Sequence, residues 1–197
     1  MTKKTKKQKP SFDVADLAVV GGGLTGFAMA LSAAHHGVTV VLIDRAPKGQ
    51  KGDETRTTTI NPKSYQHLSD LGVIAEFEAK AHVLIPIREI RVSDEKTRPQ
   101  PGLARPDELI TWSNDQPDTP LGYVFRNAEM MAVMQDLVQS HPLITCFNDI
   151  TVTDFSPKHP DYGDAAAAIY TETGDVIAAR LVAVSYTHLT LPTIYSV

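Results

Sequence analysis

A short glycine-rich segment constrains the fold of this chain more than any other feature of its sequence. The segment consists of Gly21, Gly22, Gly23, Leu24, Thr25 and Gly26, and it satisfies the pattern G-x-G-x-x-G. An apolar, β-branched run at residues 17–20 comes before it, and an Ala-, Met- and Leu-rich run at residues 24–36 comes after it. Gly37 then ends the predicted helix, and residues 38–43 are typical of a buried parallel strand. The order strand, glycine turn, helix, strand predicts a βαβ unit.

The glycine spacing has a physical meaning at a dinucleotide site. The first glycine allows a tight turn, the second lets the backbone approach a pyrophosphate, and the third lets the helix pack closely on the strand. Free N–H groups at the start of the helix favour an anion there. Asp44 comes 18 residues after Gly26, at the end of the second strand, where a carboxylate can accept hydrogen bonds from ribose hydroxyls. The alternative is a βαβ unit whose glycines serve packing only, and the spacing together with the acid favours dinucleotide binding.

The identity of the dinucleotide is left open by the spacing alone, since FAD and NAD share it. Asp44 disfavours NADP, because its carboxylate would repel a 2′-phosphate, although Arg45 would offset part of that repulsion.

The remaining chain alternates predicted helices with a larger number of short strands. An Asn61–Pro62 start predicts a helix to residue 71, and residues 128–139 form a second amphipathic pattern. Strands are predicted at residues 87–93, 109–112, 123–125 and 143–147, followed by a β-meander at residues 150–155, 166–172 and 176–182. Residues 46–58 and most of 96–120 have the composition of loops. The fold class is therefore α/β.

Charge and composition exclude several classes of protein. The net charge is −4, but five lysines lie before Pro10, and the other residues carry 14 basic against 23 acidic side chains, which argues against nucleic-acid binding. We expect residues 1–13 to form a disordered basic tail, with docking on anionic lipid as the alternative. The uncharged stretch 17–34 is interrupted by the glycines, so it is not predicted to span a membrane. The single cysteine, Cys146, cannot form an internal disulfide and is predicted to be a small core residue.

The last residues are unlike the rest of the chain. Residues 184–193 read V-S-Y-T-H-L-T-L-P-T, which corresponds to the in-frame translation of a transposon-based sequencing adaptor. We therefore expect residues 183–197 to be a non-native tail, and no helix or strand is predicted from them. The alternative is a native C-terminal strand.

Five segments resemble, in order, the para-hydroxybenzoate-hydroxylase-type flavoprotein monooxygenases. They are D-L-A-V-V-G-G-G-L-T-G from Asp16, D-E-T-R-T-T-T-I from Asp53, P-I-R-E-I-R-V-S-D from Pro86, L-G-Y-V-F-R-N from Leu121 and G-D-V-I-A-A-R-L-V from Gly174. The order is most similar to that of the ubiquinone-biosynthesis hydroxylases of the 2-octaprenylphenol type. The resemblance implies that residues 14–182 are the N-terminal part of a Rossmann-like FAD-binding domain. Strands of a β-rich, truncated substrate domain would be inserted around residues 86–125.

The resemblance also implies which residues bind the cofactor. The glycines, with the backbone at Leu24 and Thr25, would hold the FAD pyrophosphate, Asp44 the ribose, and Arg45 would lie on the adenine side. Arg56 matches a loop arginine that reaches the cofactor. Arg126 stands at a position that varies in the family, and Asn127 matches a family position but could equally cap a helix.

The implied activity is the NAD(P)H- and oxygen-dependent hydroxylation of a phenolic ring. The substrate would be a small aromatic or polyprenylphenol compound. The location would be cytoplasmic, with peripheral association at the inner face of the membrane or with a biosynthetic complex. The family's Asp-Gly and Gly-Asp motifs are absent from this sequence, so no catalytic residue is assigned, and no metal site is predicted.

Two alternatives remain: a catalytically incompetent FAD-binding fragment, and an NAD-dependent Rossmann oxidoreductase of another family. The proline-rich stretch and the β-meander argue against the second of these.

Overall fold

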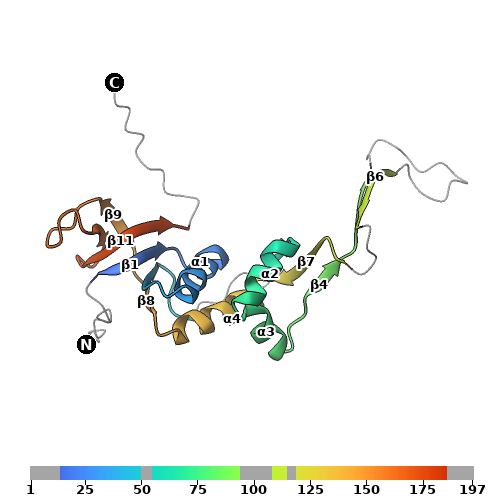
Figure 1. Ribbon diagram of the computed structural model, residues 1–197, viewed down its shortest axis with the longest axis horizontal. Helices are drawn as coiled ribbons and strands as arrows, with labels where there is room; N and C mark the ends of the chain where they lie inside the picture. Colours follow the sequence, from blue (N-terminus) through green and yellow to red (C-terminus); the bar gives the residue numbers. More distant parts are fainter. Residues whose placement is uncertain (1–13, 50–54, 94–107, 115–118, 186–197) are drawn as a thin grey trace, which may run out of the picture. The chain divides into compact units, whose positions relative to one another are not determined.

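The computed structural model describes residues 14–49, 55–93, 108–114 and 119–185 (Figure 1). The chain divides into two compact units. The first combines Met1–Gly52 with Met131–Val197, and the second is Asp53–Met130. The basic tail predicted at residues 1–13 lies outside the described residues.

The first unit is built on a sheet with the strand order β8-β2-β1-β11-β10-β9. Four of these strands are parallel: β1 (Ala15–Val20), β2 (Val40–Asp44), β8 (Ile144–Asn148) and β11 (Val176–Val184). β10 (Ala167–Thr171) and β9 (Val152–Ser156) continue the sheet with antiparallel pairing. Helix α1 (Leu24–His35) connects β1 to β2, and α4 (Asn127–Ser140) precedes β8. The predicted α/β class is confirmed.

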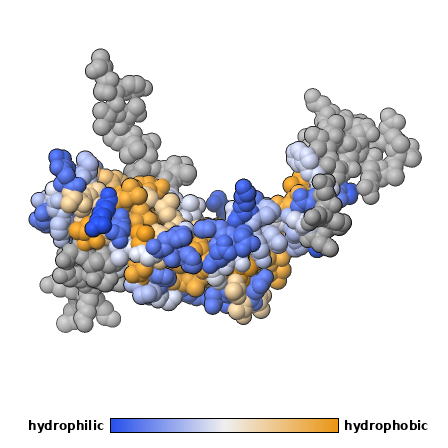
Figure 2. Space-filling model, viewed as in Figure 1, coloured by the Kyte–Doolittle hydropathy of each residue, from blue (hydrophilic) through white to orange (hydrophobic). Residues whose placement is uncertain are grey.

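The core of the first unit lies against its central strands. Val19, Val40 and Ile43 are completely buried, because β1 and β2 have a neighbouring strand on each side and packing on both faces. The predicted burial of Cys146 is confirmed. Apolar surface remains over β11, where Leu181 is 63% exposed (Figure 2).

A polar network at the amino end of β1 joins this strand to β11 and to Thr39, the residue before β2. The Asp16 carboxylate accepts hydrogen bonds from the Thr39 N–H at 3.1 Å and the Thr39 hydroxyl at 2.6 Å. Its other oxygen accepts a hydrogen bond from Arg180 Nη1 at 3.0 Å. These hydrogen bonds, those from Thr39 above all, hold the pKa of Asp16 below its ordinary value.

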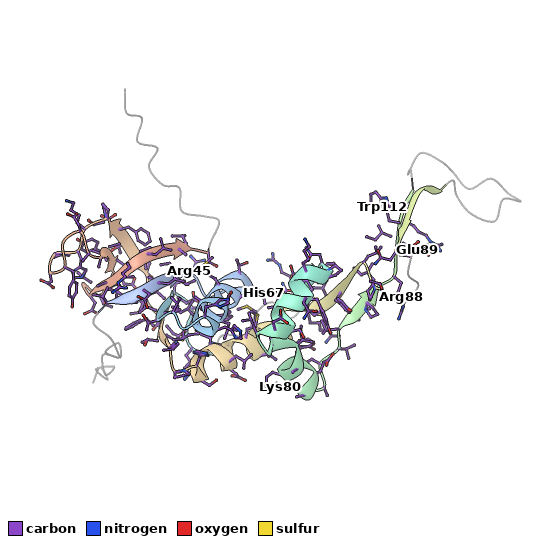
Figure 3. The ribbon with its side chains drawn as sticks, viewed as in Figure 1. Arg45, His67, Lys80, Arg88, Glu89 and Trp112 are labelled. Carbon is purple, nitrogen blue, oxygen red and sulfur yellow. The ribbon has the colours of Figure 1, made fainter. Side chains whose placement is uncertain are left out.

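The second unit contains two antiparallel sheets and two helices. β3 (Thr57–Ile60), β7 (Gly122–Arg126) and β4 (Ile85–Ile87) form one sheet in the order β3-β7-β4, and β5 (Glu89–Ser93) pairs with β6 (Glu108–Ser113). Helices α2 (Pro62–Asp70) and α3 (Val73–Ala79) complete the unit, and Phe77, Phe125 and Leu68 are buried within it. Trp112 lies on the β5–β6 hairpin and is 55% exposed (Figure 3).

Most of the predicted elements are confirmed, and three local predictions are wrong. Helix α3 was not predicted; it begins directly after Gly72, whose φ of 75° places it in the left-handed region. The strand predicted at residues 87–93 is divided at Arg88, because β4 pairs with β7 whereas β5 pairs with β6. The loop predicted at residues 46–58 ends early, because β3 begins at Thr57 and pairs with β7.

The C-terminal part of the chain follows the predicted meander. β11 runs to Val184, which pairs with Val20 of β1, and residues 186–197 lie outside the described residues. Among the helices that the structure describes, none has the length and apolarity needed to cross a membrane.

Candidate dinucleotide site

Two glycines are required where β1 leads into α1: Gly21 for its backbone conformation and Gly26 for close packing. Gly21 has a φ of 110°, a conformation that side-chain-bearing residues rarely adopt, and its N–H donates to the Ile43 carbonyl at 2.8 Å. A Cβ atom on Gly26 would lie well under 3.0 Å from the Gly21 carbonyl oxygen. Helix α1 therefore packs directly on the turn, as expected for the first and third glycines of the pattern.

None of the described residues fills the space at the N-terminus of α1. Gly23 is its N-cap, with φ −91° and ψ −176°, and no described side chain caps the helix. The first intrahelical hydrogen bond runs from the Phe27 N–H to the Gly23 carbonyl at 2.9 Å, so the backbone N–H groups of Leu24, Thr25 and Gly26 precede it. The first turn holds no acidic residue, and a Cβ on Gly23 would meet nothing within 4 Å. An anion can therefore approach these N–H groups closely.

Asp44 is fixed against the same turn. It ends β2 and is half-buried, and its Oδ1 accepts a hydrogen bond from the Ala46 N–H at 3.2 Å. A Cβ on Gly22 would lie well under 3.0 Å from Asp44 Oδ2. The carboxylate thus occupies the space that a side chain at position 22 would need.

A cleft of about 520 Å³ lies beside Asp44 in the first unit. Its lining residues end or follow β1, β2 and β8 or lie on α1 and α4: Gly22, Phe27, Asp44, Arg45, Ala46, Pro47, Met131, Gln135, Asn148 and Thr151. The loops after β2 and β8 are joined by hydrogen bonds from the Asp149 N–H to the Ala46 carbonyl and from the Ile150 N–H to the Asp44 carbonyl, both 3.1 Å. The carboxyl ends of parallel strands are where ligands bind in open α/β sheets, and the volume suits a small molecule.

The structure brings most of the candidate residues together and adds others. The glycine segment, Asp44 and Arg45 all lie around this turn and cleft, with Arg45 exposed at the end of β2 (Figure 3). Gln135, Asn148 and Thr151 also line the cleft, and they are not among the residues predicted from the sequence. Asn148 could have been found, because it ends the third parallel strand and pairs in register with Asp44. The position of Gln135 depends on how α4 packs, which no local pattern indicates.

Arg56 and Arg126 belong to the second unit. Arg126 pairs in register with Thr57, and the Asn127 N–H donates to the Arg56 carbonyl at 2.9 Å, so the structure brings the two arginines to one end of the β3–β7 pair. Both arginine side chains are exposed, and Arg126 Nη1 lies 3.8 Å from Glu129 Oε1.

The Asn127 side chain does not cap α4. Its Oδ1 is buried and has no hydrogen-bond partner in the part of the chain that the structure describes. The helix-cap interpretation is therefore wrong, because a capping side-chain oxygen accepts a backbone N–H.

Other reactive groups do not gather into a site. Within residues 14–49, 55–93, 108–114 and 119–185, no three His, Cys, Asp or Glu side chains come together as metal ligands would. Burial raises the pKa of the Cys146 thiol to about 11, so it stays protonated at neutral pH.

Sequence comparisons agree with a dinucleotide site. The model of the FAD binding domain family matches residues 14–146. The ubiquinone hydroxylase UbiM of Neisseria meningitidis is 26% identical over 172 residues, which are 84% of this chain and 34% of UbiM. The uncharacterized protein slr1300 of Synechocystis is 24% identical over 141 residues, 72% of this chain and 31% of that protein. The chain thus spans about a third of the length of these curated relatives.

Solved structures share the fold at lower identity. PqsL, a probable FAD-dependent monooxygenase from Pseudomonas aeruginosa, superposes with a TM-score of 0.62 at 14% identity, covering 85% of this chain and 41% of PqsL. FqzB gives a TM-score of 0.65 at 16% identity and covers 87% of this chain and 35% of FqzB. The family match extends over more than half of the chain, and the chain therefore belongs to the FAD-binding domain family.

Proposed function

We propose that this chain is the FAD-binding part of an FAD-dependent monooxygenase of the para-hydroxybenzoate hydroxylase type, which hydroxylates a phenolic ring in ubiquinone biosynthesis. The observation that carries the proposal is the open N-terminus of α1 at Gly23, beside a carboxylate fixed at the end of β2. This arrangement offers N–H donors for a pyrophosphate and an acceptor for ribose hydroxyls. The relative named as a ubiquinone hydroxylase supports the substrate class.

The residues of the first unit fit the ADP half of FAD. Gly23 leaves space for a phosphate where any Cβ would protrude, and the N–H groups of Leu24, Thr25 and Gly26 would donate to it. Asp44 would accept hydrogen bonds from the ribose. The cleft beside it, with Arg45 at its edge, is large enough for a base.

Three further candidates for cofactor binding belong to the second unit. Arg56 and Arg126 carry positive charge suited to a pyrophosphate, and Asn127 has a buried oxygen that no group among the described residues satisfies. When bound, FAD would supply the redox chemistry of oxygen activation, and this chain's residues would bind and orient it.

The electron donor would be NAD(P)H, and the substrate a small aromatic or polyprenylphenol compound. A nucleic-acid partner is not expected, since the chain outside its five N-terminal lysines is acidic. The protein would be cytoplasmic, and those lysines would favour peripheral association with the inner face of an anionic membrane or with a biosynthetic complex.

The first test is a titration of the purified chain with FAD, in which the quenching of flavin fluorescence measures binding. We expect saturable binding of FAD and much weaker binding of NAD. Preferential retention of NAD would contradict the proposal and favour another Rossmann oxidoreductase.

The second test uses the full-length protein that contains this chain. We expect it to consume NAD(P)H and oxygen in proportion to the hydroxylation of a short-chain polyprenylphenol. Oxidation of NAD(P)H that no phenolic compound stimulates would refute the proposed reaction while leaving FAD binding intact.

A further inference from the structure

Two neutral amide side chains line the cleft of the first unit beyond Asp44. Asn148 ends β8, and Gln135 lies on α4. Both residues are half-buried, and neither side-chain amide has a hydrogen-bond partner among the residues that the structure describes. Each amide keeps a donor and an acceptor that are partly withdrawn from water, so both side chains are suited to a polar ligand in the cleft.

The register of the sheet places Asn148 beside Asp44. The two residues are directly paired across the parallel strands β2 and β8, and neighbouring strands lie about 4.8 Å apart. Directly paired residues of parallel strands point to the same face of a sheet. The Asn148 side chain therefore lies on the same face as the Asp44 carboxylate, and both line the cleft.

The strand order indicates where each part of a nucleotide would lie. The glycine turn follows β1, Asp44 ends β2 and Asn148 ends β8, and these strands are neighbours in the order β1-β2-β8. In a nucleotide, the ribose joins the phosphates to the base. With the pyrophosphate at the turn and the ribose at Asp44, the base would lie at the end of β8, beside Asn148.

The other lining residues suit the faces of a base better than its edge. Phe27, Met131 and Pro47 are apolar and match the flat faces of an aromatic ring. Arg45 is exposed at the edge of the cleft and carries donors only (Figure 3). Thr151 is exposed and offers a single hydroxyl. A side-chain amide, in contrast, presents a donor and an acceptor side by side.

We infer that Asn148 and Gln135 recognise the edge of the adenine base of FAD and determine which base the cleft accepts. The adenine edge places the N6 amino donor next to a ring-nitrogen acceptor, and an amide offers the complementary acceptor and donor. The inference rests on the proposed function, because it takes the ligand of the cleft to be an adenine dinucleotide.

The test compares FAD with etheno-FAD, in which a two-carbon bridge joins N1 of adenine to its N6. The bridge removes the N6 amino donor and blocks N1, whereas the flavin, the pyrophosphate and the ribose are unchanged. Equilibrium dialysis against the 197-residue chain, with detection of flavin absorbance, gives both dissociation constants. We expect the unmodified chain to bind etheno-FAD about tenfold more weakly than FAD, because an amide paired with a base edge discriminates by about this factor.

Substitution of the amides should remove this preference. Asn148→Leu and Gln135→Leu should each weaken FAD binding and reduce the ratio of the two dissociation constants, and the double variant should bind both ligands about equally. A merely structural role, or a simple steric clash of the bridge with the cleft, would leave the ratio unchanged. Gln139→Leu is the matched control, because Gln139 lies one turn further along α4, is half-buried and is not among the residues that line the cleft; the tenfold ratio should persist there.

The outcomes separate the inference from the function beneath it. If the chain binds FAD but binds etheno-FAD equally well, or if the double variant keeps the full ratio, the inference alone fails. If the chain binds neither ligand, the proposed function and the inference both fail.

Discussion

Replacement of Gly23 by alanine should separate cofactor binding from folding. A Cβ at this position meets nothing within 4 Å, and φ of −91° with ψ of −176° suits alanine. Alanine is a poorer N-cap than glycine by about 0.5–1 kcal/mol. It also reduces the conformational entropy of the unfolded chain, which stabilises the folded state by about 0.4–1 kcal/mol. The free energy of unfolding should therefore change by less than about 1 kcal/mol, which is a shift in Tm of at most about 4 °C.

The same methyl group should strongly weaken FAD binding. It would project into the space before the N-terminus of α1, where we propose that the pyrophosphate lies. Loss of one hydrogen bond to a charged group costs about 1.5–3 kcal/mol, so the dissociation constant should rise by about 10- to 150-fold. Flavin fluorescence titration measures the affinity, and thermal unfolding followed by circular dichroism measures the stability.

Gly26→Ala is the contrasting control. Its Cβ would lie well under 3.0 Å from the Gly21 carbonyl oxygen, so the helix or the turn must move even without a ligand. Such overpacking costs about 1–3 kcal/mol and should lower Tm by several degrees. The reasoning is refuted if Gly23→Ala binds FAD with unchanged affinity, or if Gly23→Ala lowers stability as much as Gly26→Ala does.

Three further outcomes follow from particular side chains. Asp44→Asn should raise the dissociation constant of FAD by about tenfold, because an amide is a weaker acceptor for ribose hydroxyls than a carboxylate. Asp149→Asn, in the adjacent exposed loop, is the control and should leave the dissociation constant unchanged. Equal effects of the two substitutions in a fluorescence titration would argue against a ribose contact. The hydrogen bonds from Thr39 lower the pKa of Asp16, so the stability they confer is present above the unfolded pKa of about 3.9 and is lost as the pH falls through the lower folded pKa. Asp16→Asn should lower the free energy of unfolding at pH 7 by about 1 kcal/mol, a value that allows for the solvent exposure of Asp16. The free energy of unfolding should also depend less on pH between about 5 and 2. Parallel acid-unfolding curves for the two proteins would show that the Thr39 hydrogen bonds do not stabilise the fold in this way. The Cys146 thiol, whose pKa burial raises to about 11, should react with a thiol reagent at pH 8 only after unfolding by denaturant, and rapid labelling of the native protein would mean that the residue is accessible.

The βαβ unit could be predicted from the sequence because local patterns and tertiary packing agree there. The glycine turn, the apolar strands on each side of it and the acid at position 44 are each local signals, and α1 and β2 lie within a few residues of their predicted bounds. Asn61 likewise predicts the start of α2, where its Oδ1 accepts the Ser64 N–H at 2.8 Å.

The second unit was harder to predict because pairing partners decide its elements. Thr57 and Thr58 fall in the loop predicted at residues 46–58, yet they belong to β3 because β7 supplies a partner strand. The sequence predicts that the helix from Pro62 ends at residue 71. Gly72 follows in the left-handed conformation and begins the next helix, so α3 is not predicted.

The cleft shows the same limit within the candidate site. Asn148 was open to prediction from the strand order, since it ends a strand parallel to β2. Met131 and Gln135 line the cleft only because of the way α4 packs in the first unit, and an amphipathic pattern does not reveal which neighbour a helix will find.

The position of β11 in the sheet has a consequence for the order of folding. β11 is the last described strand in the chain, yet it lies between β1, the first, and β10, so the network that joins Asp16 to Arg180 closes a loop of 164 residues. Contacts this distant in sequence form slowly, because the entropy of closing the loop must be overcome before they stabilise anything. During synthesis β1 would have only β2 beside it until the chain beyond Val176 emerges, whereas the second unit is complete once Met130 has been made. Pulsed hydrogen exchange during refolding should accordingly protect the amides of β7 before those of β1.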